Sequence, residues 1–120
     1  MPQRITLGAA EEAMQKILER ELRPTAVLAT NDVMAVGAML ACRNAGAKIP
    51  QDISITGIDN TDLGATQVPG LTSVRTPIVE IGTAAAEQLI LRLEGKEFAA
   101  NQALPFEVVV RGSTGPLKGR

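Results

Sequence analysis

Two pairs of short polar residues have the types and spacing needed to bind a small polar molecule. Asn31-Asp32 and Asp59-Asn60 each follow directly on a short, mainly apolar segment. Together they supply two carboxylates and two carboxamides, which offer many hydrogen-bond acceptors and several donors. A sugar or a nucleoside needs that mixture of groups. The alternative interpretation is that the first pair only caps the following helix and that the second pair only forms a turn.

The hydrophobic pattern predicts that these pairs lie at one edge of a parallel sheet. Segments 25–29 and 53–58 are typical of buried strands, and residues 33–43 between them are typical of a helix. A strand-helix-strand crossover makes its two strands parallel. Ligands of open α/β sheets bind outside the carboxyl ends of the strands. We therefore expect Asn31 and Asp59 to lie side by side at that edge.

The remaining elements complete an α/β domain. A helix is predicted over residues 8–20, a long loop over 60–70, a short strand over 71–75 and a last strand over 106–111. Residues 112–120 are expected to form a frayed terminus. The predicted fold is a single domain, residues 1–120, with a three-layer parallel sheet that carries helices on both faces.

Two of the predicted helices have unusual apolar surfaces. The helix over 33–43 is apolar nearly all round, so one side can pack on the sheet while the other needs a partner subunit or domain. Thr76 is expected to cap a second helix, with Pro77 at its first position and an apolar stripe along residues 78–94.

The composition excludes several functions. The 120 residues are 45% hydrophobic and 21% charged with a net charge of −1, which fits one globular domain without the positive field that nucleic acids attract. The chain has no His and a single cysteine, Cys42, so a His-based triad, a Cys/His zinc site and a disulfide framework are excluded. We expect no catalytic residue, metal or cofactor and no enzyme activity of the common kinds. The absence of a leader and of a long apolar run predicts a cytoplasmic protein without membrane contact.

A phosphoacceptor receiver domain is the rival from another class. Asp32, Asp59 or Asp62 would then hold a hard cation. That function needs an acidic pair after the first strand and a lysine near the end of a late strand. Lys96 instead follows a helix, so the receiver interpretation is disfavoured. A solvated acidic loop is likewise favoured over a metal site at Asp59 and Asp62.

Five segments, in order along the chain, resemble the successive signatures of the LacI/GalR family of bacterial transcriptional repressors. The segments are Arg23-Pro-Thr-Ala-Val27, Thr30-Asn-Asp-Val-Met-Ala-Val-Gly37, Ile49-Pro-Gln-Asp-Ile-Ser-Ile-Thr-Gly-Ile-Asp-Asn60, Leu71-Thr-Ser-Val-Arg-Thr-Pro77 and Val110-Arg-Gly-Ser-Thr114. The resemblance implies the C-terminal subdomain of a core that is similar to periplasmic sugar-binding proteins. It also implies that DNA is contacted only through an N-terminal helix-turn-helix domain that this chain lacks.

The resemblance implies roles for particular residues. Asn31 and Asp59 match positions that hydrogen-bond a small-molecule effector of the sugar or nucleoside class, and Thr76 matches a position at the crossover that lines the cleft. The family also forms homodimers partly through the helix after Asn31-Asp32. The dimer residues expected here are Val33, Val36, Met39 and Leu40.

The resemblance also places helix 78–94 on the sheet of an N-terminal subdomain that this chain lacks. Its apolar stripe is therefore expected to fold back on the chain's own sheet or to pack against another copy. The alternatives to a regulator are a transport-type sugar-binding protein of the same fold and a pure assembly module. The ending Val110-Arg-Gly-Ser-Thr114 disfavours the transport protein.

Overall fold

The computed structural model describes residues 6–117, which form four helices, four strands and the segments between them. The elements are α1 (Leu7–Leu18), β1 (Ala26–Leu28), α2 (Asp32–Asn44), β2 (Ser54–Ile58), α3 (Asp62–Ala65), β3 (Thr72–Arg75), α4 (Ile78–Leu93) and β4 (Glu107–Val109). They belong to two compact units. The sheet unit consists of the chain up to Arg75 and from Val108 onward, and the α4 unit consists of Thr76–Glu107.

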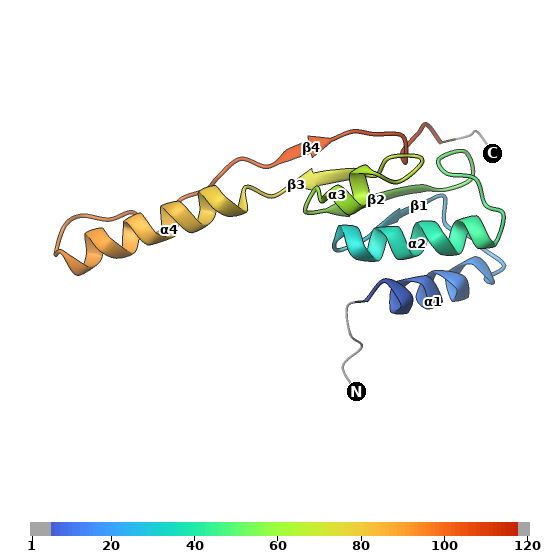
Figure 1. Cartoon of the computed structure of the whole chain (residues 1–120), viewed down its shortest axis with the longest axis horizontal. Coiled ribbons are helices and arrows are strands. Elements are labelled where there is room, and N and C mark those ends of the chain that lie inside the picture. Colours follow the sequence, from blue (N-terminus) through green and yellow to red (C-terminus); the bar gives the residue numbers. More distant parts are fainter. Residues whose placement is uncertain (1–5, 118–120) are drawn as a thin grey trace. The chain divides into compact units, whose positions relative to one another are not determined.

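The sheet has the order β1-β2-β3-β4, and its first three strands are parallel (Figure 1). Leu28 of β1 pairs with Thr56 of β2, and Ile58 pairs with Val74 of β3. The chain that leaves β4 runs back beside β3, because the Ser113 N–H donates to the Gly70 carbonyl at 3.0 Å. The predicted α/β class and the parallel pairing of the first two strands are confirmed.

Helices α1 and α2 begin and end where local chemistry satisfies their free backbone groups. The Thr6 hydroxyl accepts from the Ala9 N–H at 3.2 Å, and the Asn31 side chain accepts from the Met34 N–H at 2.9 Å. Such caps pair the amides that a helix leaves free in its first turn. Gly46, just beyond α2, has φ +73°, a conformation that favours glycine at a helix end.

Helix α2 lies between α1 and the sheet, and this explains its apolar surface. It contacts β2 on one side and α1 on the other, and both helices lie below the strands in Figure 1. A Cβ added at Gly37 would lie 2.7 Å from the Ala10 Cβ, so the two helices approach as closely as side chains permit. α1 thus stacks on α2 rather than on the sheet, and Leu28 of β1 stays 75% exposed.

Two of the four residues expected at a dimer surface are buried in this arrangement, and the dimer contact itself stays a prediction. Val36 and Met39 are buried within the chain, at 2% and 0% exposure. Their side chains therefore pack in the core of the same chain and are not available to a partner. Val33 and Leu40 are half-buried and remain candidates for contact with a second copy.

Three local predictions differ from the structure. The loop over 60–70 contains the short helix α3, whose Thr61 cap accepts from the Gly64 N–H at 3.3 Å. Pro77, not Thr76, precedes α4, and it provides no side-chain cap. The segment expected to fray is fixed in part, because Ser113 is completely buried and its hydroxyl donates to the Ile55 carbonyl at 2.6 Å. The end of that segment, residues 118–120, lies outside the described residues.

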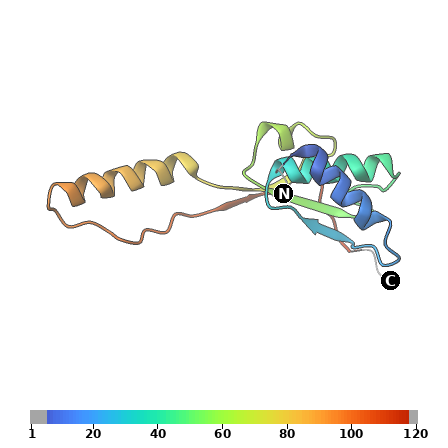
Figure 2. The same ribbon diagram turned by 90° about the horizontal axis from the view of Figure 1, so that it is seen from below.

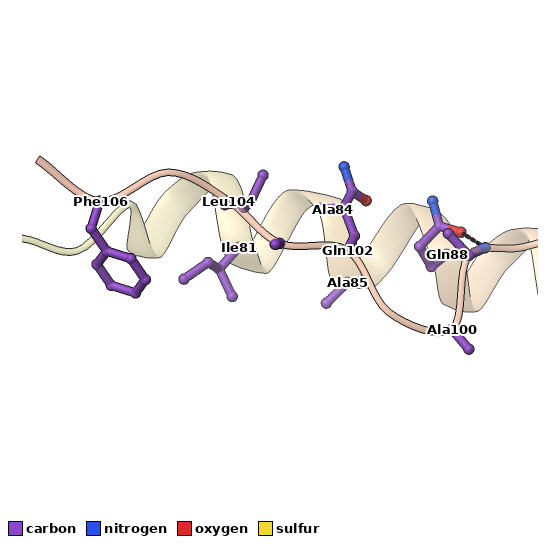
Figure 3. A pocket seen from close by; sticks show the side chains of 10 residues that line it. Ile81, Ala84, Ala85, Gln88, Ala100, Gln102, Leu104 and Phe106 are labelled. Atoms are coloured by element: carbon purple, nitrogen blue, oxygen red, sulfur yellow. Dashed lines mark hydrogen bonds between the residues drawn. The ribbon is translucent and has the colours of Figure 1, made fainter.

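The α4 unit consists of α4 and a return segment that runs beside it (Figure 3). The Gln88 side chain accepts from the Ala99 N–H at 2.6 Å, and the Arg92 guanidinium lies 5.5 Å from the centre of the Phe98 ring. Helix and return segment border a hollow of about 450 Å³. No residue of α4 is buried, and what covers its apolar stripe stays a prediction.

Among residues 6–117, no helix has both the length and the apolar composition needed to cross a membrane.

Candidate functional site

The carboxyl ends of β1 and β2 bring Asn31 and Asp59 to the same edge of the sheet. Just beyond the last strand pair, the Ala29 N–H donates to the Thr56 carbonyl at 2.9 Å, so the segment that leaves β1 still lies beside β2; Figure 2 shows the ribbon from below. Neighbouring strands lie about 4.8 Å apart. The predicted placement is thus supported by the parallel register, whereas ligand binding at these residues stays a prediction.

Asn31 serves first as the cap of α2. Its Oδ1 accepts from the Met34 N–H, as the capping interpretation expected. Its Nδ2 group has no hydrogen bond to another residue in the part of the chain that the structure describes, and the side chain is half-buried. The cap fixes the orientation of the amide and leaves Nδ2 as a donor. The two interpretations of Asn31 are therefore compatible.

The turn at Asp59-Asn60 has an unusual backbone. Asp59 has φ +108° and Asn60 has φ +52°, a region that residues other than glycine rarely adopt. The Asp59 N–H donates to the Val74 carbonyl at 2.8 Å, and its side chain is exposed. Such strained positions persist only where surrounding contacts hold them, and they cluster at functional sites.

Asp32 is a buried centre of hydrogen bonding, with 1% exposure. Its Oδ2 accepts from the Thr61 N–H at 2.6 Å and from the Thr61 hydroxyl at 2.9 Å, while its Oδ1 accepts from the Ser73 hydroxyl at 2.6 Å. A Cβ added at Gly64 would lie 3.0 Å from Oδ2, so the backbone closes over the carboxylate. Asp32 therefore ties α2 to the turn and to β3, and its oxygens face protein groups.

Asn60 is likewise used inside the protein. Its N–H donates to the Ser73 hydroxyl at 3.0 Å, and its Oδ1 accepts from Arg111 Nη2 at 2.7 Å. Sequence reasoning missed Arg111 as a functional residue. Because 51 residues separate it from Asn60, no local pattern could have indicated the contact.

Thr76 belongs to the α4 unit. It is half-buried, and its carbonyl accepts from the Ile78 N–H at 2.8 Å. Its predicted role in lining the cleft stays a prediction.

The site offers hydrogen-bonding groups, among them the exposed carboxylate of Asp59. Within residues 6–117, no group of three or more His, Cys, Asp or Glu side chains is arranged to hold a metal ion. Asp59 has an exposed carboxylate at this edge, and Asn31 has a partly exposed amide there. A carboxylate accepts two or more hydroxyl hydrogens and an amide donates to a hydroxyl oxygen, so this pair suits a neutral polyol.

Residues 2–114 match the sequence family described as the periplasmic binding protein-like domain. The chain belongs to that family. It is 39% identical over 113 residues to the transcriptional repressor CytR of Escherichia coli strain K12, covering 93% of this chain and 33% of CytR. It is 43% identical over 115 residues to the transcriptional regulator DegA of Bacillus subtilis strain 168, covering 95% of this chain and 34% of DegA. The chain thus spans about a third of the length of these relatives.

Solved structures of LacI-family regulators have the same fold. A regulator from Bifidobacterium animalis subsp. lactis superposes with a TM-score of 0.88 at 30% identity, covering 92% of this chain and 41% of that one. The lac repressor dimer superposes with a TM-score of 0.85 at 30% identity, covering 91% of this chain and 38% of the repressor. These similarities confirm the resemblance to LacI/GalR regulators. The relatives are transcriptional regulators rather than enzymes.

Proposed function

We propose that this chain is the effector-binding and dimerisation portion of a LacI/GalR-type transcriptional regulator. The proposal is supported by one observation: Asn31 and Asp59 follow two adjacent parallel strands, β1 and β2, in a chain whose relatives include the repressor CytR. Ligands of such sheets bind outside that edge. The regulator's contact with DNA would lie outside these residues, since their net charge of −1 provides no attraction for phosphates.

A neutral sugar or nucleoside is the effector class that the exposed groups favour. The Asp59 carboxylate would accept from two vicinal hydroxyls, and the Asn31 amide would donate to a ring or hydroxyl oxygen. Two related structures support this class. An Arthrobacter regulator that superposes with a TM-score of 0.80 was solved in complex with lactose, and the lac repressor was solved with operator and the anti-inducer ONPF.

The effector would act by changing how two subdomains close on each other. A ligand that binds the closed form more tightly than the open form shifts the population toward closure, and closure would alter the spacing of the DNA-binding heads. Thr76, the first residue of the α4 unit, keeps its proposed role as a ligand-binding residue. Val33 and Leu40 would contribute to the contact between protomers.

Titration of the ¹⁵N-labelled chain with small ligands tests the proposal. The probes are D-ribose, D-galactose, adenosine and cytidine. Binding of each probe is monitored through the amide chemical shifts, which detect even millimolar affinity. We expect at least one probe to shift the amide signals of Asn31, Asp59 and Asn60 in a saturable way. Inositol phosphate serves as a control for non-specific polyol contact.

Two outcomes would contradict the proposal. One is the absence of saturable shifts with all four probes. The other is a set of shifts confined to residues far from the strand ends, such as those along α1.

A further inference from the structure

We propose that Arg111 is a positioning residue for the effector site. Its guanidinium holds Asn60, and through Asn60 it holds the neighbouring Asp59 carboxylate in the conformation that meets the ligand. The inference deepens the proposed function and rests on it, because Asp59 is assigned to the effector there.

The turn that carries Asp59 needs to be held. Both Asp59 and Asn60 have positive φ, a conformation that costs free energy for residues with a Cβ. Two contacts fix the backbone amides: Asp59 N–H to the Val74 carbonyl at 2.8 Å, and Asn60 N–H to the Ser73 hydroxyl at 3.0 Å. The contact with Arg111, at 2.7 Å, fixes the Asn60 side chain.

Arg111 is itself anchored on several sides. Its Nη1 donates to the Leu71 carbonyl at 2.7 Å, and its backbone N–H donates to the Thr72 hydroxyl at 2.9 Å. Its stem covers Gly70, where an added Cβ would lie 3.1 Å from the Arg111 Cδ. The planar guanidinium thus bridges two fixed acceptors, one at the start of β3 and one on the turn. A lysine ammonium lacks that rigid two-pronged geometry.

The place of Arg111 in the chain adds to its role. It follows β4, the strand through which the chain returns to the sheet unit after the α4 unit. A residue on this returning segment therefore contacts the turn that presents Asp59. A ligand that stabilises the Asp59-Asn60 turn is expected to stabilise the contact between Asn60 and Arg111 as well, because couplings between binding events are reciprocal.

The test compares Arg111→Met and Arg111→Lys with a matched control, Arg43→Met, in the full chain. Arg43 is exposed and donates to Gln67 on the surface, so it tests the loss of an arginine elsewhere. Backbone ¹³C shifts of Asp59 and Asn60, which report φ, and their amide exchange rates are measured without ligand. The affinity for D-ribose and adenosine is then measured by titration.

We expect Arg111→Met to shift the ¹³C signals of both turn residues toward negative φ and to accelerate exchange of the Asn60 amide about tenfold. The affinity for a probe that binds the wild-type chain should fall by a similar factor. Arg111→Lys should recover part of the loss, and Arg43→Met should match the wild type.

A second background separates positioning from general stability. Glycine adopts positive φ without cost, so Asn60→Gly should keep the turn without help from the guanidinium. Adding Arg111→Met to Asn60→Gly should then leave the Asp59 signals unchanged. The inference would be overturned if Arg111→Met changed the Asp59 signals equally in the wild type and in Asn60→Gly. It would also be overturned if Arg111→Met alone kept the ¹³C shifts and amide exchange rates of the wild type. If the wild-type chain binds no probe, the proposed function fails, while the ligand-free shifts still decide whether Arg111 holds the turn.

Discussion

Asp32 joins three segments of the sheet unit, and its loss should destabilise the fold. Removing the carboxylate leaves the Thr61 N–H and the Ser73 hydroxyl without their acceptor in a buried position. We expect Asp32→Ala to lower the free energy of unfolding by about 2–5 kcal/mol, measured by urea denaturation. Asp62→Ala on the exposed start of α3 is the control and should change it by less than about 0.5 kcal/mol. Equal stability of the two variants would show that the Asp32 network is not structural.

Cys42 provides a second test at the residue scale because it is the single cysteine of the chain and is 0% exposed. Burial raises the pKa of its thiol above the ordinary value of 9.0, since the charged thiolate is desolvated in the core. The pKa of the Cys42 thiol is therefore higher in the folded state than in the unfolded state. The stability contributed by the protonated thiol is fully present below the unfolded-state pKa, and it is lost as pH rises through the folded-state pKa. Stability should therefore fall from about pH 9 upward, and it should fall less in Cys42→Ala. Thermal unfolding at a series of pH values measures the stability of both proteins. Identical dependence of stability on pH in the wild type and in Cys42→Ala would contradict this prediction.

At this scale, the sequence identified the polar pairs Asn31-Asp32 and Asp59-Asn60. It could not show which of these residues face a ligand and which form hydrogen bonds within the protein. Asn31 and Asp59 keep groups that can meet a ligand, whereas Asp32 and Asn60 bond within the protein. That division depends on Ser73 and Arg111, which lie 41 and 51 residues away from their partners in the chain. Contacts of that separation follow from the tertiary fold, so residue types and local spacing carried no signal for them.

At the scale of elements, the close approach of α1 and α2 depends on Gly37. A methyl group there would meet the Ala10 Cβ at 2.7 Å and the Glu11 backbone nitrogen at 3.1 Å. We expect Gly37→Ala to cost about 1–3 kcal/mol of stability, because the helices would have to separate. Gly8→Ala in α1 is the matched control, since an added Cβ there meets no atom within 4 Å. Urea denaturation of both variants would measure the difference, and a neutral Gly37→Ala would contradict the packing.

The elements themselves were largely predictable because hydrophobic periodicity determines them. The helix predicted over 33–43 is observed over Asp32–Asn44, and the strand predicted over 53–58 is observed over Ser54–Ile58. α3 was missed because a helix of four residues has no measurable period. The sequence indicated that α2 is apolar nearly all round, but it could not show that α1 covers part of that surface.

At the scale of the whole molecule, the apolar stripe of α4 is expected to drive association. Ile81 and Leu89 are 42% and 56% exposed, and burying such surface gains about 25 cal/mol per Å². We predict that the chain self-associates as its concentration rises, measured by sedimentation velocity. Ile81→Glu with Leu89→Glu should weaken association, while the control Thr83→Glu on the polar side should not. A monomer at every concentration would contradict this prediction.

Asp59, just beyond the carboxyl end of β2, is the residue that we expect to bind the effector. The most direct measurement compares the affinities of wild type, Asp59→Asn and Asp62→Asn for the sugar or nucleoside that shifts the Asn31 and Asp59 amides most. Asp62 carries an exposed carboxylate three residues further along, so it controls for the loss of a charge near the site. We expect Asp59→Asn to weaken binding about tenfold or more, because a charge-assisted hydrogen bond is lost, and Asp62→Asn to bind like the wild type. Equal affinities in all three proteins would contradict this expectation.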